Sequence, residues 1–84
     1  MPKLTRQPVA GIKFTMNFRE HNPPHFHASY KGHEMAMLFN GTVLVGSLPS
    51  AQERIAAEWA RLHQAALAER WELAQSGRNF TTID

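Results

Sequence analysis

The feature that most restricts how this chain can fold is the Pro23-Pro24 step, which precedes a segment rich in histidine. The ring of Pro23 fixes its own φ, and Pro24 disfavours the α conformation at the residue before it. We therefore expect a rigid, extended elbow from which a strand begins. Four of the five histidines lie close to this elbow, at His21, His25, His27 and His33.

The composition is that of a small globular domain. The chain has 84 residues, of which 43% are hydrophobic and 19% charged, which suits one modest core and excludes a disordered chain. It contains no cysteine, so disulfides and thiolate metal sites are excluded. No charged-then-apolar leader and no run of ~20 apolar residues is present, so we expect a cytoplasmic protein without a membrane partner. The net charge of +2 permits a nucleic-acid partner without arguing for one.

The first half of the chain predicts an antiparallel sheet over residues 12–47. After an N-terminal arm (residues 1–11), apolar and polar residues alternate from Ile12 to Phe18, which is the period of a half-buried strand. Further strands are predicted over Phe26–Tyr30, His33–Phe39 and Thr42–Gly46, joined by turns at Lys31-Gly32 and Asn40-Gly41. Of the two turns, Asn-Gly carries the stronger signal because it suits type I′ geometry. The result is a meander of about four strands.

The second half predicts one long helix over residues 50–76. Ser50 and Glu53 have the spacing of a capping box at its start, and Gly77 occupies the position just after its end. At ~39 Å for ~26 residues, this helix is expected to overhang the sheet. The predicted fold is therefore α+β: a single domain (1–84) in which the meander packs against one long C-terminal helix. A tail (77–84) follows, in which Asn79–Ile83 is a candidate short final strand.

The apolar face of the predicted helix is wider than packing on one surface requires. Apolar residues cover roughly half of its circumference, against ~100° for a single packed stripe. Two interpretations remain open: the N-terminal arm covers the excess, or this face binds a second copy of the chain or another protein. Because aromatic anchors favour interfaces, the second interpretation places an interface at Trp59, His63, Leu67 and Trp71, with Trp71 near its centre.

The histidines of the second predicted strand form the candidate site. His25 and His27 are two residues apart, so their side chains share one face with Cα atoms ~6.6 Å apart. A two-residue turn at Lys31-Gly32 pairs Ser29 with Glu34 and places Glu34 diagonal to His27 on that face. The candidate metal ligands are His25, His27, Glu34 and, from the elbow, His21; a one-residue slip of the hairpin replaces Glu34 by His33.

Three interpretations of this site remain open. Two neutral imidazoles with a carboxylate or a third histidine suit Zn, Ni, Fe or Cu. A histidine that titrates near neutral pH beside cationic residues suits acid–base chemistry or phosphate contacts on RNA or DNA. For this second interpretation the catalytic candidates are His25 and His27, and the candidate binding residues are Arg19, His21, His25, His27, Tyr30 and Lys31. In the third interpretation the imidazoles are structural and cap the elbow or bond to neighbouring carbonyl groups.

Several motifs along nearly the whole chain resemble a known family. They are the Asn22-Pro23-Pro24-His25-Phe26-His27-Ala28 block, Tyr30, the Gly46-Ser47-Leu48-Pro49 turn, Glu58-Trp59, Leu62-His63, Trp71-Glu72-Leu73-Ala74 and Ile83. On these residues the chain resembles the domain-of-unknown-function 4160 family of small bacterial proteins. The resemblance implies no assigned activity, but members are often encoded beside another small uncharacterised protein, an arrangement similar to toxin–antitoxin pairs.

From the small size, the wide apolar face and this resemblance we expect an intracellular interaction module rather than an enzyme. It would belong to a toxin–antitoxin-like or regulatory gene pair and bind a second copy of itself or the product of a neighbouring gene. The contact surfaces would be the basic, histidine-bearing sheet edge and the tryptophan-rich helix face. The alternatives are a transition-metal-binding protein and a small ribonuclease or nucleic-acid-binding protein.

Overall fold

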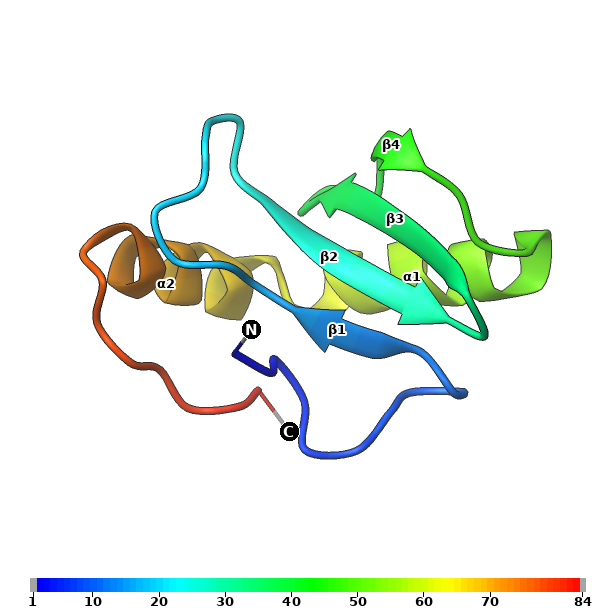
Figure 1. Cartoon of the computed structure of the whole chain (residues 1–84), viewed down its shortest axis with the longest axis horizontal. Helices are drawn as coiled ribbons and strands as arrows, with labels where there is room; N and C mark the ends of the chain where they lie inside the picture. The colour runs from blue at the N-terminus through cyan, green and yellow to red at the C-terminus, as the bar shows by residue number, and fades with distance from the viewer. Residues whose placement is uncertain (1, 84) are drawn as a thin grey trace.

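The computed structural model describes residues 2–83 and has one four-stranded sheet and two helices (Figure 1). The strands are β1 (Lys13–Thr15), β2 (His25–Tyr30), β3 (His33–Leu38) and β4 (Val43–Gly46), and the helices are α1 (Ser50–Leu62) and α2 (Gln64–Gln75). Each strand pairs antiparallel with the next, in the order β1-β2-β3-β4. The predicted α+β meander is therefore confirmed. Met1 and Asp84, at the ends of the predicted arm and tail, lie outside the described residues.

The alternation of apolar and polar residues sets the two faces of the sheet. Phe26 pairs with Met37 and Ala28 with Phe14, and these side chains are buried on the face that packs against the helices. Residues between them project from the opposite face, called here the open face; in Figure 1, α1 passes behind β2 and β3, on the other side. β1 is shorter than the predicted Ile12–Phe18, and Phe18 is 40% exposed.

The turn at Lys31-Gly32 has the geometry on which the register of β2 and β3 depends. Lys31 and Gly32 have φ values of 43° and 85°, so both residues adopt the positive φ that a type I′ turn requires. Tyr30 pairs with His33 and Ser29 with Glu34 across this turn. The predicted pairing of the hairpin is thus confirmed.

The turn at Asn40-Gly41 differs from the type I′ geometry predicted for it. Gly41 has a φ of 94°, but Asn40 does not have a positive φ. The N–H of Gly41 donates to the carbonyl of Leu38, and the N–H of Leu38 donates to the carbonyl of Thr42. These bonds close a loop of residues 39–41 in which glycine alone is left-handed. The side-chain oxygen of Asn40 accepts a hydrogen bond from the N–H of Thr42, and this bond stabilises the loop in addition to the backbone hydrogen bonds.

The predicted single helix over residues 50–76 is wrong, because two helices meet at His63. The His63 backbone has φ −122° and ψ 24°, which is not helical. Its ring Nδ1 donates to the carbonyl of Trp59 at 2.8 Å, while its N–H donates to Ala60. The ring thus takes the carbonyl that the backbone N–H of a continuous helix would bind. The longest extent of the chain is 33 Å, which is shorter than the ~39 Å of one continuous helix.

The two ends of the helical region follow the sequence signals to different degrees. The N-cap of α1 is Pro49, whose carbonyl accepts a hydrogen bond from Glu53 and whose side chain makes no capping bond. The predicted capping box is therefore wrong, because Ser50 is already the first helical residue. At the other end Gly77 has a φ of 70° and its N–H donates to Ala74, as predicted for a left-handed residue after a helix.

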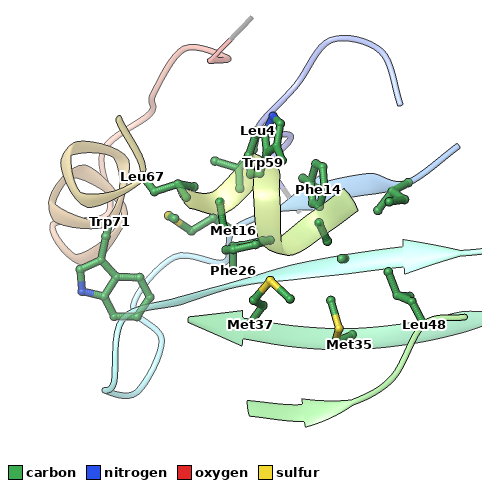
Figure 2. Packing of buried hydrophobic residues seen from close by; sticks show 14 of the residues in the cluster. Leu4, Phe14, Met16, Phe26, Met35, Met37, Leu48, Trp59, Leu67 and Trp71 are labelled. Atoms are coloured by element: carbon green, nitrogen blue, oxygen red, sulfur yellow. The ribbon is translucent and has the colours of Figure 1, made fainter. Parts of the chain in front are cut away.

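Most of the wide apolar face of the helices is covered within the chain itself, although Leu62 is 74% exposed. Figure 2 shows Trp59 next to Leu4 of the N-terminal arm, and both belong with Leu67 to one buried cluster, as in the interpretation in which the arm covers the excess. Trp59 also stacks on Phe14, with ring centroids 4.1 Å apart. Trp71 is only 4% exposed, so the residue placed at the centre of the predicted interface is in the core instead. Four residues were predicted to form the interface: Trp59, His63, Leu67 and Trp71. His63 is half-buried, and the other three are buried.

The described segment after α2 forms no strand, so the candidate final strand at Asn79–Ile83 is wrong. A backbone hydrogen bond from the N–H of Ile83 to the carbonyl oxygen of Leu4 ties it to the N-terminal arm. Among residues 2–83, neither helix has the length and apolar character needed to cross a membrane.

Candidate functional site

Two imidazoles of β2 converge on one carboxylate, that of Glu20. The rings of His25 and His27 have centroids 5.1 Å apart. The Nε2 atom of His27 is 3.0 Å from Oε1 of Glu20, and the Nε2 atom of His25 is 3.6 Å from Oε2. One candidate ligand atom from each of these three residues lies within 4.8 Å of the other two. We call these three residues the Glu20–His25–His27 cluster.

The elbow between β1 and β2 places Glu20 beside these histidines. This segment is the light-blue loop at the upper left of Figure 1, and its Asn22–Pro23 peptide bond is cis. The N–H of Arg19 donates to the carbonyl of Ala74 at 3.1 Å, and Nε2 of Gln75 donates to the carbonyl of Glu20 at 3.0 Å. Both partners belong to the end of α2. The position of Glu20 therefore depends on how α2 packs.

His25 is fixed in one orientation by its second ring nitrogen. Its Nδ1 lies 2.7 Å from the carbonyl oxygen of Pro23, and because a carbonyl only accepts, Nδ1 must carry a hydrogen. In the neutral imidazole this leaves the lone pair on Nε2, the atom that faces Glu20. The ring also lies 5.5 Å from that of Trp71, and the residue is 7% exposed. This bond to the elbow is the one expected of a structural histidine, and it also selects Nε2 for binding a ligand.

The environment of Glu20 favours its ionised form. The amide Nδ2 of Asn17 donates to Oε1 at 2.6 Å, and this bond is the largest cause that lowers the pKa of Glu20. Partial burial raises this pKa, while the hydrogen bond with His27 and the charges of both histidines lower it, and the net direction is downward. An ionised carboxylate beside two imidazoles can accept a hydrogen bond from His27 and can share a cation with both rings.

The structure brings together only part of the predicted ligand set. Glu34 has the predicted pairing with Ser29 but lies outside the cluster, as does His21, which is exposed in the elbow. His33 pairs with Tyr30 and is also outside it. Glu20 takes the place of Glu34 as the carboxylate. The signal that could have identified it is its position in the sequence, one residue before His21 and three residues before Pro23.

The other predicted binding residues do not surround the cluster. Tyr30 is five residues beyond His25 on β2, or roughly 17 Å away along the strand. Lys31 lies over the Tyr30 ring, with its Nζ 5.4 Å from the ring centroid, at the hairpin turn. The guanidinium of Arg19 lies beside Gly77, at the end of the helical region.

A family comparison agrees with the motifs around the cluster. The family described as Domain of unknown function (DUF4160) matches residues 11–72. The chain belongs to this family. The matched part of this DUF4160 protein contains all four strands, α1, most of α2 and every residue of the Glu20–His25–His27 cluster. No curated protein and no solved structure matches the chain.

Proposed function

We propose that this DUF4160 protein binds a transition-metal ion through Glu20, His25 and His27. The supporting observation is the spacing of the three side chains. Two ligand atoms that each lie about 2.1 Å from a tetrahedral ion are about 3.4 Å apart. The two carboxylate–imidazole distances are 3.0 and 3.6 Å, to different oxygens of Glu20, and one ligand atom of each residue lies within 4.8 Å of the other two, so side-chain movements can bring the three to an ion.

The ligand set suits Zn, Ni, Fe or Cu, because imidazole and carboxylate are ligands that these ions share. Three protein ligands leave at least one coordination position free for water or for another molecule. The His27 side chain is 31% exposed and gives access to solvent, while the side chain of His25 is almost fully buried. The cluster therefore has one closed side and one open side.

The groups behind the ligands also suit a metal centre. Metal-binding histidines usually donate their second ring N–H to a carbonyl or carboxylate, as His25 does to Pro23. Ligating carboxylates are in turn hydrogen-bonded, as Glu20 is by the amide of Asn17. The same contacts stabilise the elbow when no ion is bound, so measuring the metal separates a metal centre from a purely structural role.

Elemental analysis of the protein, purified without a histidine tag, tests the proposal. We expect about one equivalent of Zn, Ni, Fe or Cu per chain, and rebinding of the ion after treatment with a chelator. His27→Ala and Glu20→Gln should lose this metal. His33→Ala is the matched control, because His33 is an exposed histidine outside the cluster. A wild-type protein that neither retains nor rebinds any of the four ions would contradict the proposal.

A second candidate function is an interaction module of a toxin–antitoxin-like or regulatory pair, acting in the cytoplasm. It is supported by β4, an edge strand of the sheet on which Leu44 is 44% and Val45 65% exposed. A strand of another chain can add to such an edge. Because Trp59, Leu67 and Trp71 are buried, this edge replaces the helix face as the proposed contact surface.

Size-exclusion chromatography with light scattering tests the interaction module. The protein should form a homodimer alone or a complex with the product of its neighbouring gene, and Val45→Asp should weaken either assembly. A strict monomer that ignores that neighbour would count against this second function.

A further inference from the structure

The open face of the sheet carries rows of side chains that lead away from the candidate metal centre. Residues paired across antiparallel strands project from the same face. Thr15 pairs with His27 on β2 and forms a bridge with Lys3 of the N-terminal arm, so these three residues form one row. Two strand spacings of ~4.8 Å separate Lys3 from His27, or roughly 10 Å between their Cα atoms. Lys13 begins the next row through its pairing with Ser29.

A cationic cavity of about 370 Å³ lies at the arm end of these rows. Its lining includes Lys3, Arg6 and Lys13, and among residues 2–83 it includes no acidic residue. All three side chains are positively charged at neutral pH. The cavity therefore has the electrostatic character of a site for an anion.

The walls of this cavity are fixed by the backbone. The N–H of Leu4 donates to the carbonyl of Phe14 at 2.9 Å, and Val9 and Ile12 exchange two hydrogen bonds, at 2.8 and 2.9 Å. Leu4 and Ile12 are fully buried, so the arm is anchored to the core on both sides of Arg6. The cationic residues thus project from a backbone that is already ordered, which lowers the entropic cost of binding a ligand.

A second cavity, of about 420 Å³, lies on the open face of the sheet. Its lining extends from Lys13 and Thr15 across His27 to Val45. Lys13 and Thr15 also line the cationic cavity, so the two cavities adjoin along β1. The open face therefore offers one path from the cationic end to the exposed side of His27.

We propose that the cationic cavity binds the phosphate group of a phosphate ester, with the rest of the ligand lying on the open face toward His27. A phosphate offers several strong acceptor oxygens that more than one cationic side chain can share. The lysines act as point charges, each of which can contact a phosphate oxygen. Phosphate binding stands on the cavity alone, whereas the direction of the ligand rests on the proposed function, because it requires a metal at His27.

Two sources supply this chemistry: a small phosphate ester such as a nucleotide, or a backbone phosphate of single-stranded RNA. The test uses AMP and a fluorescein-labelled RNA octamer with the full chain, first treated with chelator. At low salt we expect at least one probe to bind; Lys3→Gln and Lys13→Gln should each weaken it about tenfold, as loss of one charge-assisted contact does. For the octamer, the slope of log affinity against log salt should fall by about 1 in each variant.

Lys31→Gln is the matched control, because Lys31 is an exposed lysine that does not line the cationic cavity. If AMP competes with the octamer, the result supports a small phosphate ester as the ligand of the cationic cavity. If only the octamer binds, the result supports nucleic acid as the ligand. No binding of either probe, or equal losses in Lys13→Gln and Lys31→Gln, would overturn the proposal. Circular dichroism and thermal unfolding show whether each variant is folded.

The two proposals fail separately. If metal binds but neither phosphate probe does, only the proposal for the cationic cavity is contradicted. If a phosphate probe binds but no metal does, only the proposal for the metal centre is contradicted. The direction of the ligand is tested by loading paramagnetic Co²⁺ and recording the NMR spectra of bound AMP. The adenine and ribose protons should be broadened more than the ³¹P signal, and the reverse order would contradict the orientation.

Discussion

Replacing Glu20 by glutamine separates a metal centre from a structural cluster, because the change keeps the shape of the side chain and removes its charge. Without metal the variant loses a charge-assisted hydrogen bond of 3.0 Å to His27. Such bonds contribute 1.5–3 kcal/mol, which partial exposure of both partners reduces to about 1 kcal/mol. In a domain of this size the unfolding midpoint should fall by about 4–8 °C.

The metal-dependent part of the effect is larger. An ion at about one hundred times its Kd stabilises the native state by about 2.7 kcal/mol. With saturating Zn²⁺, wild type and Glu20→Gln should therefore differ by about 4 kcal/mol in the free energy of unfolding, against about 1 kcal/mol with chelator. Glu34→Gln is the matched control, since Glu34 is the carboxylate predicted from the sequence but lies outside the cluster.

Urea unfolding followed by tryptophan fluorescence measures these differences, because both tryptophans are buried. The experiment is run with Zn²⁺ and with chelator on the wild type and the two variants. Equal gains from Zn²⁺ in the wild type and in Glu20→Gln would refute the assignment of Glu20 as a ligand. A gain that Glu34→Gln abolishes and Glu20→Gln keeps would restore the ligand set predicted from the sequence.

Three further predictions concern stability. Gly46→Ala should cost roughly 3 kcal/mol or more in urea unfolding, because the backbone has a φ of 76° and a Cβ there would clash with the carbonyl oxygen of Glu34. Gly77→Ala should cost only about 1 kcal/mol, since φ is 70° but the nearest atoms belong to the flexible Arg19 side chain. Because the pKa of Glu20 is lowered in the folded state, its contribution is fully present above the ordinary value of 4.5 and is lost as pH falls through the folded pKa. Glu20→Gln should therefore flatten the acid limb of a stability–pH profile, and an unchanged limb would contradict this.

The hairpin of β2 and β3 was predictable because its register depends on two adjacent residues. Once Lys31 and Gly32 form a two-residue turn, the pairing of every residue of β2 with β3 follows, including that of Ser29 with Glu34. The other turn was less predictable, since Asn40-Gly41 is compatible with loops of two or three residues. Only the paired strands determine which loop forms.

The alternation and pairing of residues along strands could not identify Glu20, because Glu20 lies in the elbow between β1 and β2 rather than on a strand. Its place is determined by contacts with Ala74 and Gln75, and Gln75 is 55 residues further along the chain. The spacing and periodicity of residues in the sequence do not reveal contacts between residues that lie so far apart in the chain. Glu34, in contrast, was found at its predicted register but without the predicted neighbours.

The apolar periodicity that predicted one helix over residues 50–76 gave no sign of the break at His63. Trp59, Ala60, Leu67, Trp71 and Ala74 are buried at spacings that suit one continuous apolar face, and this pattern runs across His63 without a gap. The break depends on the ring of His63 binding the Trp59 carbonyl, which is a choice of side-chain rotamer. The wide face likewise contained no information on whether the arm or another protein would cover it.

The attachment of the elbow to the end of α2 has a consequence for cooperativity. Arg19 and Glu20 contact the last residues of α2 through their backbones, while the carboxylate of Glu20 reaches the histidines of β2. α2 is separated from α1 by the break at His63, so α2 can open without α1. A ligand that joins Glu20 to β2 therefore makes the C-terminal helix and the central hairpin open and close as one unit.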